Sequence, residues 1–198
     1  MQRRWLKVLT MVALATGAAA ACDRPTSPLA PRASGPVSPR LSVTSGGYFI
    51  GGWKLLEGSH DALQTRINVI DQRGGKLNIG ASALIVPAGA VSGPTMFVFT
   101  LQTDPYISTK LVAMALSGPG MGRLVTVFAQ PLTLTISYAG AKQQVPDPAK
   151  ARVLWVENGV LLAVQPTSAQ GNKLTTTVTH FTEYVPSIPD PNDDTGLN

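Results

Sequence analysis

Cysteine, histidine and charged side chains are scarce in this chain. One cysteine and two histidines occur among 198 residues, and Asp, Glu, Lys and Arg together make up 14%. A single cysteine excludes an internal disulfide and a zinc site with several thiolates. Two histidines leave little material for a multi-histidine metal centre. We therefore expect neither a metal site nor a cofactor.

Positive charge is concentrated at the beginning of the chain. The net charge is +5, from 16 Lys and Arg against 11 Asp and Glu, but Arg3, Arg4 and Lys7 lie within the first seven positions. Without them, 13 basic residues face 11 acidic ones, which gives +2. No run of three consecutive basic residues occurs. Nucleic-acid binding needs clustered Lys and Arg, so we expect no nucleic-acid partner.

The first 21 residues have the order of an export signal. Basic residues are followed by the mostly apolar stretch Val8–Ala15 and then by four alanines, Ala18–Ala21. This order is typical of a secretory signal peptide. The apolar stretch is too short to cross a bilayer, which takes about 20 residues. We expect residues 1–21 to be a signal peptide and the protein to be exported.

Cys22, the only cysteine, directly follows this signal. Ala19-Ala20-Ala21-Cys22 resembles the lipobox of bacterial lipoproteins, although Ala19 stands where Leu is most usual. The resemblance implies that Cys22 carries lipid, such as palmitate, and becomes the first residue. Two or more acyl chains hold a protein stably on a membrane. The alternative is ordinary cleavage after Ala21, which leaves Cys22 as a free thiol. Lipid attachment predicts a cell-envelope protein, with inner or outer membrane undecided.

A segment rich in proline and serine comes next. Residues 23–47 contain few large apolar side chains and show no periodicity. Its prolines and serines are Pro25, Pro28, Pro31, Pro36, Pro39, Ser27, Ser34, Ser38, Ser42 and Ser45. Such a composition favours extended chain at about 3.1 Å per residue. We expect residues 22–47 to be the lipidated cysteine and a disordered tether that spans up to roughly 70 Å.

From Tyr48 onward, short apolar runs are separated by Gly, Pro, Asn and Asp. Leu132–Tyr138 alternates with a period of two, which predicts a half-buried strand. Met96–Leu101 is apolar on both faces, as is typical of a central strand. Asn158-Gly159 predicts a two-residue hairpin turn. Further strands are expected at Leu84–Val86, Leu111–Leu116, Leu124–Phe128, Val153–Val156, Val160–Val164 and Leu174–Val178.

Many short strands without an amphipathic helix predict an all-β fold, an antiparallel β-sandwich. We place this domain at residues 48–187 and a disordered acidic tail at residues 188–198. The segment Tyr48–Thr65, with Trp53, has two interpretations: an added pair of strands or a packed extension. Trp53 and Trp155 suit either a ligand groove or ordinary packing.

Three stretches, in order, resemble the ZU-five domain, a β-sandwich module of zonula occludens proteins, netrin receptors and ankyrins. The first runs from Gly74 to Val91 and contains Ile85-Val86-Pro87-Ala88-Gly89-Ala90. The second is Phe128–Ile136, with Pro131-Leu132-Thr133-Leu134, and the third is Val178–Val185. The resemblance covers about residues 68–186 and implies the same sandwich fold.

One candidate for chemistry lies in the third stretch. In some animal relatives of this domain the chain cleaves itself between Phe and Ser, and a nearby His assists. The resemblance places His180 as base and Thr182 as nucleophile, with Thr where Ser is typical. Cleavage between Phe181 and Thr182 would release 17 residues. The alternative is that both are ordinary residues of a closing strand.

Other chemical motifs are incomplete. Ser59, His60 and Asp61 are triad-type residues, but a triad is assembled in space rather than by adjacency, and no Gly-x-Ser-x-Gly occurs. The acidic residues near the C-terminus lack the glycine and the terminal Glu of a calcium loop. The sequence therefore favours a non-enzymatic lipoprotein that displays its sandwich to a protein or envelope-polymer partner, by loops or by strand addition.

Overall fold

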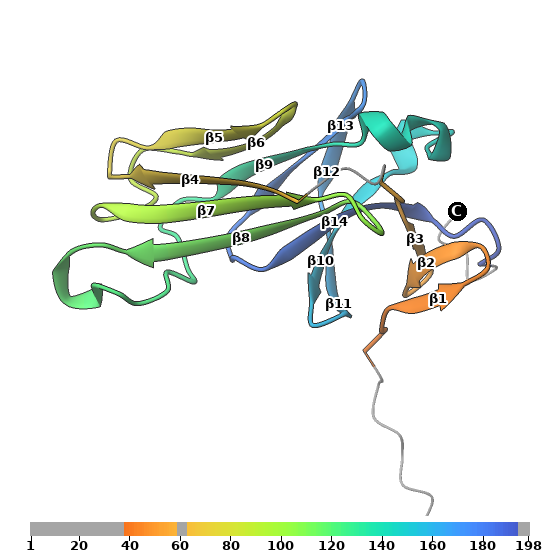
Figure 1. The fold of residues 1–198 in the computed structure, drawn as a ribbon, viewed down its shortest axis with the longest axis horizontal. Helices are drawn as coiled ribbons and strands as arrows, with labels where there is room; N and C mark the ends of the chain where they lie inside the picture. The colour runs from red at the N-terminus through yellow and green to blue at the C-terminus, as the bar shows by residue number, and fades with distance from the viewer. Residues whose placement is uncertain (1–37, 59–62, 194–198) are drawn as a thin grey trace, which may run out of the picture. The chain divides into compact units, whose positions relative to one another are not determined.

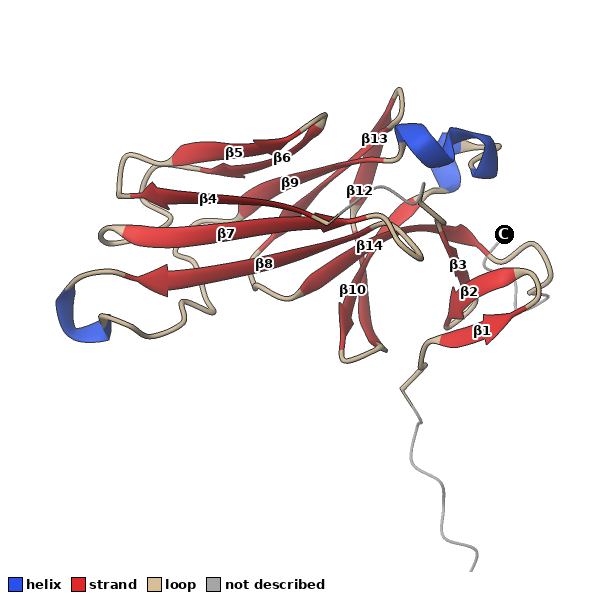
Figure 2. Ribbon diagram, in the orientation of Figure 1, coloured by secondary structure: helices blue, strands red, loops and turns tan. Residues whose placement is uncertain are grey.

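A computed structural model describes residues 38–58 and 63–193. These residues form two antiparallel β-sheets packed face to face, so the all-β sandwich predicted from the sequence is confirmed (Figures 1 and 2). The described strands lie within one compact unit, Val37–Asn198. Three short 3₁₀ helices connect strands: η1 (Gly118–Gly120), η2 (Ala139–Gln144) and η3 (Pro148–Lys150).

The larger sheet has nine strands, seven of them in the order β1-β2-β3-β14-β8-β7-β4. Strand β10 pairs with both β14 and β11, which gives the sheet a branch at β14. Its strands are β1 (Ser42–Thr44), β2 (Gly47–Ile50), β3 (Trp53–Leu55), β4 (Gln64–Ile70), β7 (Thr95–Gln102), β8 (Ser108–Ala115), β10 (Arg152–Glu157), β11 (Val160–Gln165) and β14 (Glu183–Pro189).

The smaller sheet has five strands in the order β12-β13-β9-β6-β5. They are β5 (Gly75–Ile79), β6 (Ser82–Val86), β9 (Leu132–Ser137), β12 (Thr167–Gln170) and β13 (Lys173–Val178). Figure 1 shows this sheet above the larger one, with β5, β6 and β9 over β4, β7 and β8. Strands β4 and β5, which follow one another in the chain, are edge strands of different sheets.

Alternating side chains fill the main core between the sheets. In β9, Leu132, Leu134 and Ile136 are fully buried, as the period of two predicts. In β7, Phe97 and Phe99 point inward, and the Phe97 ring contacts those of Phe128 and Phe181. Full burial of one such side chain stabilises the folded state by about 1.5–3 kcal/mol relative to leaving it exposed. The main core therefore orients the two sheets and fixes their inner faces.

A second, smaller core lies on the outer face of the larger sheet. Its buried members come from β2, β3, β10 and β14: Ile50, Trp53, Leu55, Leu154, Val156 and Val185. The segment that the sequence left undecided is thus an addition to the sheet, because β3 pairs with β14 and β2 pairs with β3. Strand β1 lies within residues 22–47, the expected tether, and β14 extends to Pro189, within the expected tail.

The hairpin predicted at Asn158-Gly159 is confirmed. Both residues have positive φ, 51° and 72°, as a type I′ turn between β10 and β11 requires. The strand predicted at Leu124–Phe128 is wrong. Leu124 forms an isolated bridge with Met114, and the Val125 amide donates to the Ala113 carbonyl at 2.9 Å. The chain then leaves β8 and carries Phe128 into the main core, so no ladder develops.

Candidate functional site

The predicted lipid attachment residue, Cys22, lies outside the described residues, as do the signal peptide and residues 23–37 of the tether. In the part of the chain that is described, no helix has the length and apolar character needed to span a bilayer. The three triad-type residues Ser59, His60 and Asp61 are also outside the described residues. Lipid attachment at Cys22 stays a prediction.

His180, the predicted base, is exposed at the entry to β14. Its ring stacks on that of Trp155, with centroids 5.1 Å apart and planes inclined by 12°. Its Nδ1 lies 2.9 Å from Thr179 Oγ1. Trp155 therefore contacts His180 from the neighbouring strand β10, which favours the packing interpretation of this tryptophan.

Thr182, the predicted nucleophile, forms its hydrogen bonds with residues other than His180. Its hydroxyl donates to the Val156 carbonyl at 3.0 Å, and its carbonyl accepts from the Leu111 amide at 3.0 Å. The Phe181 ring packs 4.5 Å from that of Phe128. Proton transfer from Thr182 to His180 requires both side chains to leave the partners they have here. The cleavage hypothesis stays a prediction.

Tyr184 holds this segment in place. Its hydroxyl donates to the His180 carbonyl at 2.8 Å, and its ring is buried in the main core. Burial raises the pKa of the Tyr184 phenol well above its usual range, because the ionised form loses solvation. The phenol thus remains a proton donor at ordinary pH. It fixes the backbone on one side of the Phe181–Thr182 bond.

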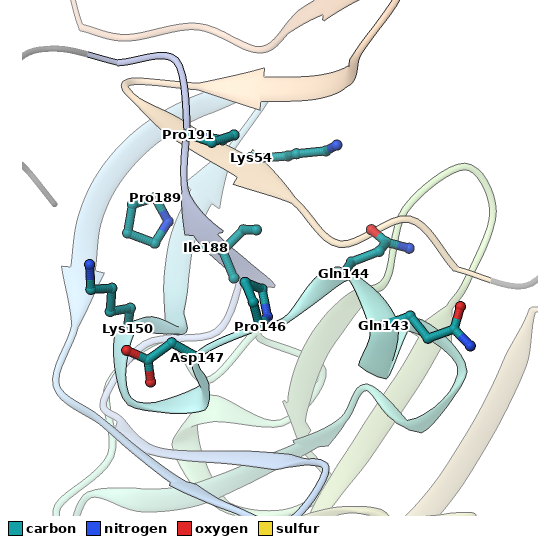
Figure 3. A pocket seen from close by; sticks show the side chains of 9 residues that line it. All are labelled: Lys54, Gln143, Gln144, Pro146, Asp147, Lys150, Ile188, Pro189 and Pro191. Carbon is teal, nitrogen blue, oxygen red and sulfur yellow. The ribbon is translucent and has the colours of Figure 1, made fainter.

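A cleft of about 460 Å³ opens beside the end of β14 (Figure 3). It lies between the 3₁₀ helices η2 and η3 on one side and strands β3 and β14 on the other. The residues that line it are Lys54, Gln143, Gln144, Pro146, Asp147, Lys150, Ile188, Pro189 and Pro191. They come from three segments of the chain, and only the fold brings these segments together.

The cleft has an apolar centre formed by proline rings and one isoleucine. Ile188 and Pro189 belong to the last residues of β14, and Pro146 links η2 to η3. Prolines have no amide hydrogen to donate to a strand ladder, and Pro189 is the last residue of β14. Their rigid rings present an apolar surface with little conformational entropy to lose on binding.

Polar groups surround this centre. The amide of Gln144 clamps η2 to the chain after β3, since its Oε1 accepts from the Glu57 amide at 3.0 Å and its Nε2 donates to the Glu57 carbonyl at 2.9 Å. Asp147 caps η3, accepting from the Ala149 amide at 3.0 Å. Lys54 and Lys150 lie at opposite sides of the cleft in Figure 3. An apolar floor with a few fixed polar groups is typical of a ligand site.

The sequence does not reveal this cleft, because Lys54 lies in the undecided segment Tyr48–Thr65 and the other lining residues fall around a turn and in the expected tail. The cluster Pro146–Pro148 predicts a turn, and residues 188–191 fall in the expected tail. Lys54 lies more than 130 positions from Pro189. The high proline content of both segments was the available signal, but it does not reveal that they meet.

Comparison with known protein families and with curated proteins finds no match for this chain. The resemblance to the ZU-five domain therefore stays a prediction. Among the residues described, no group of three or more His, Cys, Asp and Glu side chains is placed to hold a metal ion.

Proposed function

We propose that this chain is a non-enzymatic lipoprotein of the bacterial cell envelope that binds a partner through the cleft beside β14. Lipid on Cys22 anchors it to a membrane, and the residues after Cys22 connect the anchor to the sandwich. The observation that carries the binding function is the cleft itself, with its apolar proline floor and its two flanking lysines, Lys54 and Lys150. The partner is a protein segment or an envelope polymer.

The anchor is tested by intact mass spectrometry of the protein isolated from its native membrane fraction. A mass that begins at Cys22 and includes a diacylglyceryl group supports the proposal. An unmodified chain that begins at Cys22 contradicts it, because that species is a secreted protein with a free thiol. The same spectrum detects loss of residues 182–198, which is the product of the alternative self-processing function.

The cleft is tested by photocrosslinking in cells that produce the anchored protein. A photoreactive residue replaces Gln143, which lines the cleft, or Gln170, an exposed glutamine on β12 that serves as the matched control. We expect a discrete adduct from position 143 and none from position 170. The mass of the adduct distinguishes a protein from a polymer. Absence of an adduct at position 143, or the same adduct at both positions, contradicts binding in the cleft.

A further inference from the structure

The outer face of the larger sheet is apolar where strands β4, β7 and β8 lie side by side. Ile67, Val98 and Val112 stand opposite one another in register across these three strands. Residues directly opposite one another in a sheet share a face. Ile67 is 63% exposed and Val112 is 42% exposed, so this row points into solvent rather than into the main core.

A second row lies beside the first. Val69, Met96 and Met114 are paired in register, and the bridge from Met114 to Leu124 extends the row beyond β8. Val69 is 54% exposed and Leu124 is 66% exposed. We call these two rows the open face. Solvent-facing sides of antiparallel sheets are normally polar, and a contiguous exposed apolar patch marks an interaction site.

The charged side chains on the segments that form the open face are all basic. Lys110 of β8 lies on the open face, two positions before Val112, and Arg123 directly precedes Leu124. Arg66 of β4 is in register with the buried Phe99 and therefore lies on the opposite face. Residues 64–70, 95–102 and 108–131 contain no Asp or Glu. Acidic residues occur only on neighbouring segments. Glu183 of β14 is opposite Lys110 in register, and Asp71 is bonded to Arg73. The open face thus combines aliphatic side chains with positive charge.

We infer that the open face docks on a bilayer surface of anionic phospholipid. Its aliphatic side chains enter the boundary between headgroups and acyl chains, and its basic side chains pair with phosphate groups, a combination that binds membranes in proportion to apolar area and charge. Contacts with acyl chains and phosphate groups require no shaped pocket, so the flat face of a sheet can make them.

Charge and composition favour this occupant over a second copy of the chain. In a symmetric dimer the same patch meets itself, so two faces whose charged side chains are basic would be brought together and repel. The two rows contain no Trp, Tyr or Phe, the residues that dominate binding energy at protein interfaces together with Arg.

The chain between the proposed anchor and the domain is short. Fifteen residues, 23–37, separate Cys22 from Ser38, the first described residue. Fully extended, they reach at most roughly 50 Å. The inference rests on the proposed function in this respect: lipid on Cys22 would keep the open face at high local concentration near the bilayer, so weak docking suffices. Docking itself needs only the domain.

Vesicle flotation of Val37–Asn198 tests the inference. This unit contains every described strand pairing and both cores, so it folds without the leader, and it lacks Cys22. At low ionic strength we expect it to float with vesicles of equal parts phosphatidylglycerol and phosphatidylethanolamine, and not with phosphatidylcholine vesicles. Replacement of Ile67 and Leu124 by Thr should weaken binding about tenfold, from the apolar area removed.

Further variants separate the two contributions. Lys110→Gln with Arg123→Gln should weaken binding about tenfold or more and remove its dependence on salt. The matched control replaces Leu162 and Val164 by Thr, since these aliphatic residues on β11 are 45% and 42% exposed but lie outside the open face. Binding of the control should equal that of the unsubstituted unit.

Three outcomes overturn the inference: equal binding to both kinds of vesicle, undiminished binding after substitution of the open face, or a dimer in analytical ultracentrifugation that Ile67→Thr with Leu124→Thr dissociates. The last outcome identifies a second copy as the occupant. Because the unit tested lacks Cys22, these results do not depend on whether the isolated protein carries lipid. Failure of the anchor and failure of docking are therefore distinguishable.

Discussion

The outer face of the larger sheet is apolar in two regions, one around β14 and one around β4, β7 and β8, and the chain covers only the first. Around β14, the chain covers its own apolar residues, because β2, β3 and β10 bring Ile50, Trp53 and Leu154 onto Val185. At the β4 end, Ile67 and Val112 of the open face are left exposed. Figure 2 shows the short strands β1, β2 and β3 beside β14 and none of them over β4 and β7.

The difference shows in how each strand is buried. In β14, four consecutive residues, Tyr184 to Ser187, are buried, since one face meets the main core and the other meets the second core. In β7, burial alternates strictly along the strand, although both faces are apolar. Apolar residues on both faces therefore do not establish two-sided burial. They establish only that each face suits an apolar contact, within the chain or outside it.

Trp53→Ala should have the largest effect on stability, because it empties part of the covered region around β14. Trp53 is 7% exposed and is the largest side chain of the second core, so its removal should lower the free energy of unfolding of Val37–Asn198 by about 3–5 kcal/mol. Urea denaturation measures this loss. The matched control, Ile67→Ala on the open face, should cost no more than about 0.5 kcal/mol. Equal losses would mean that the two regions of the outer face do not differ in burial.

Tyr184→Phe tests the two-sided burial of β14. Loss of the hydrogen bond to the His180 carbonyl should lower the free energy of unfolding by about 1–2 kcal/mol at pH 7. The folded-state pKa of this phenol is raised, so its contribution to stability is complete below the unfolded pKa of about 10 and is lost as pH rises beyond it.

The alkaline range provides the sharper measurement for Tyr184. Unsubstituted protein should lose stability steeply above about pH 10, and Tyr184→Phe should lose less over the same range. Burial also raises the pKa of Tyr138, so some alkaline loss should remain in the variant. Identical slopes in the two proteins would contradict the buried environment of Tyr184.

Thr182→Ala should have a smaller effect. The Thr182 hydroxyl, directly before β14, donates to the Val156 carbonyl of β10, so the variant should lose about 0.5–1 kcal/mol of unfolding free energy in urea denaturation. Intact mass should show no release of residues 182–198 from either protein. A 17-residue fragment in the unsubstituted protein that disappears in Thr182→Ala would establish the self-processing function instead.

The sequence predicts the parts of this fold that depend on local pattern. The alternation of β9 and the Asn158-Gly159 turn are properties of adjacent residues, so both were identified correctly. The sequence also predicts that Met96–Leu101 lies inside a sheet, and β7 does lie between β4 and β8. It does not show that Met96 and Val98 belong to an uncovered face.

The remaining features depend on contacts between distant segments. Strand β3 has three residues, too few to show a period, and it forms because β14 offers a partner edge. The cleft joins Lys54 to prolines near the C-terminus. Trp53 and Trp155 gave identical expectations, yet one fills the second core and the other stacks on His180. Composition alone gives no information about which tryptophan meets which partner.

Val112→Thr should have the smallest effect on stability, and it tests directly whether the open face is exposed where the second core is buried. Val and Thr have nearly the same shape, so the substitution changes polarity alone, and at the open face it should alter the free energy of unfolding by no more than about 0.5 kcal/mol. Val156→Thr makes the same change at a residue that is 4% exposed in the second core, where a buried hydroxyl should cost about 1–3 kcal/mol. Urea denaturation of both variants at one pH measures the difference.

Equal costs would mean that the open face is covered in solution and that the membrane is not its occupant. If Val112→Thr leaves stability unchanged, folding does not account for the aliphatic character of this face, and an external contact becomes the physical reason for it.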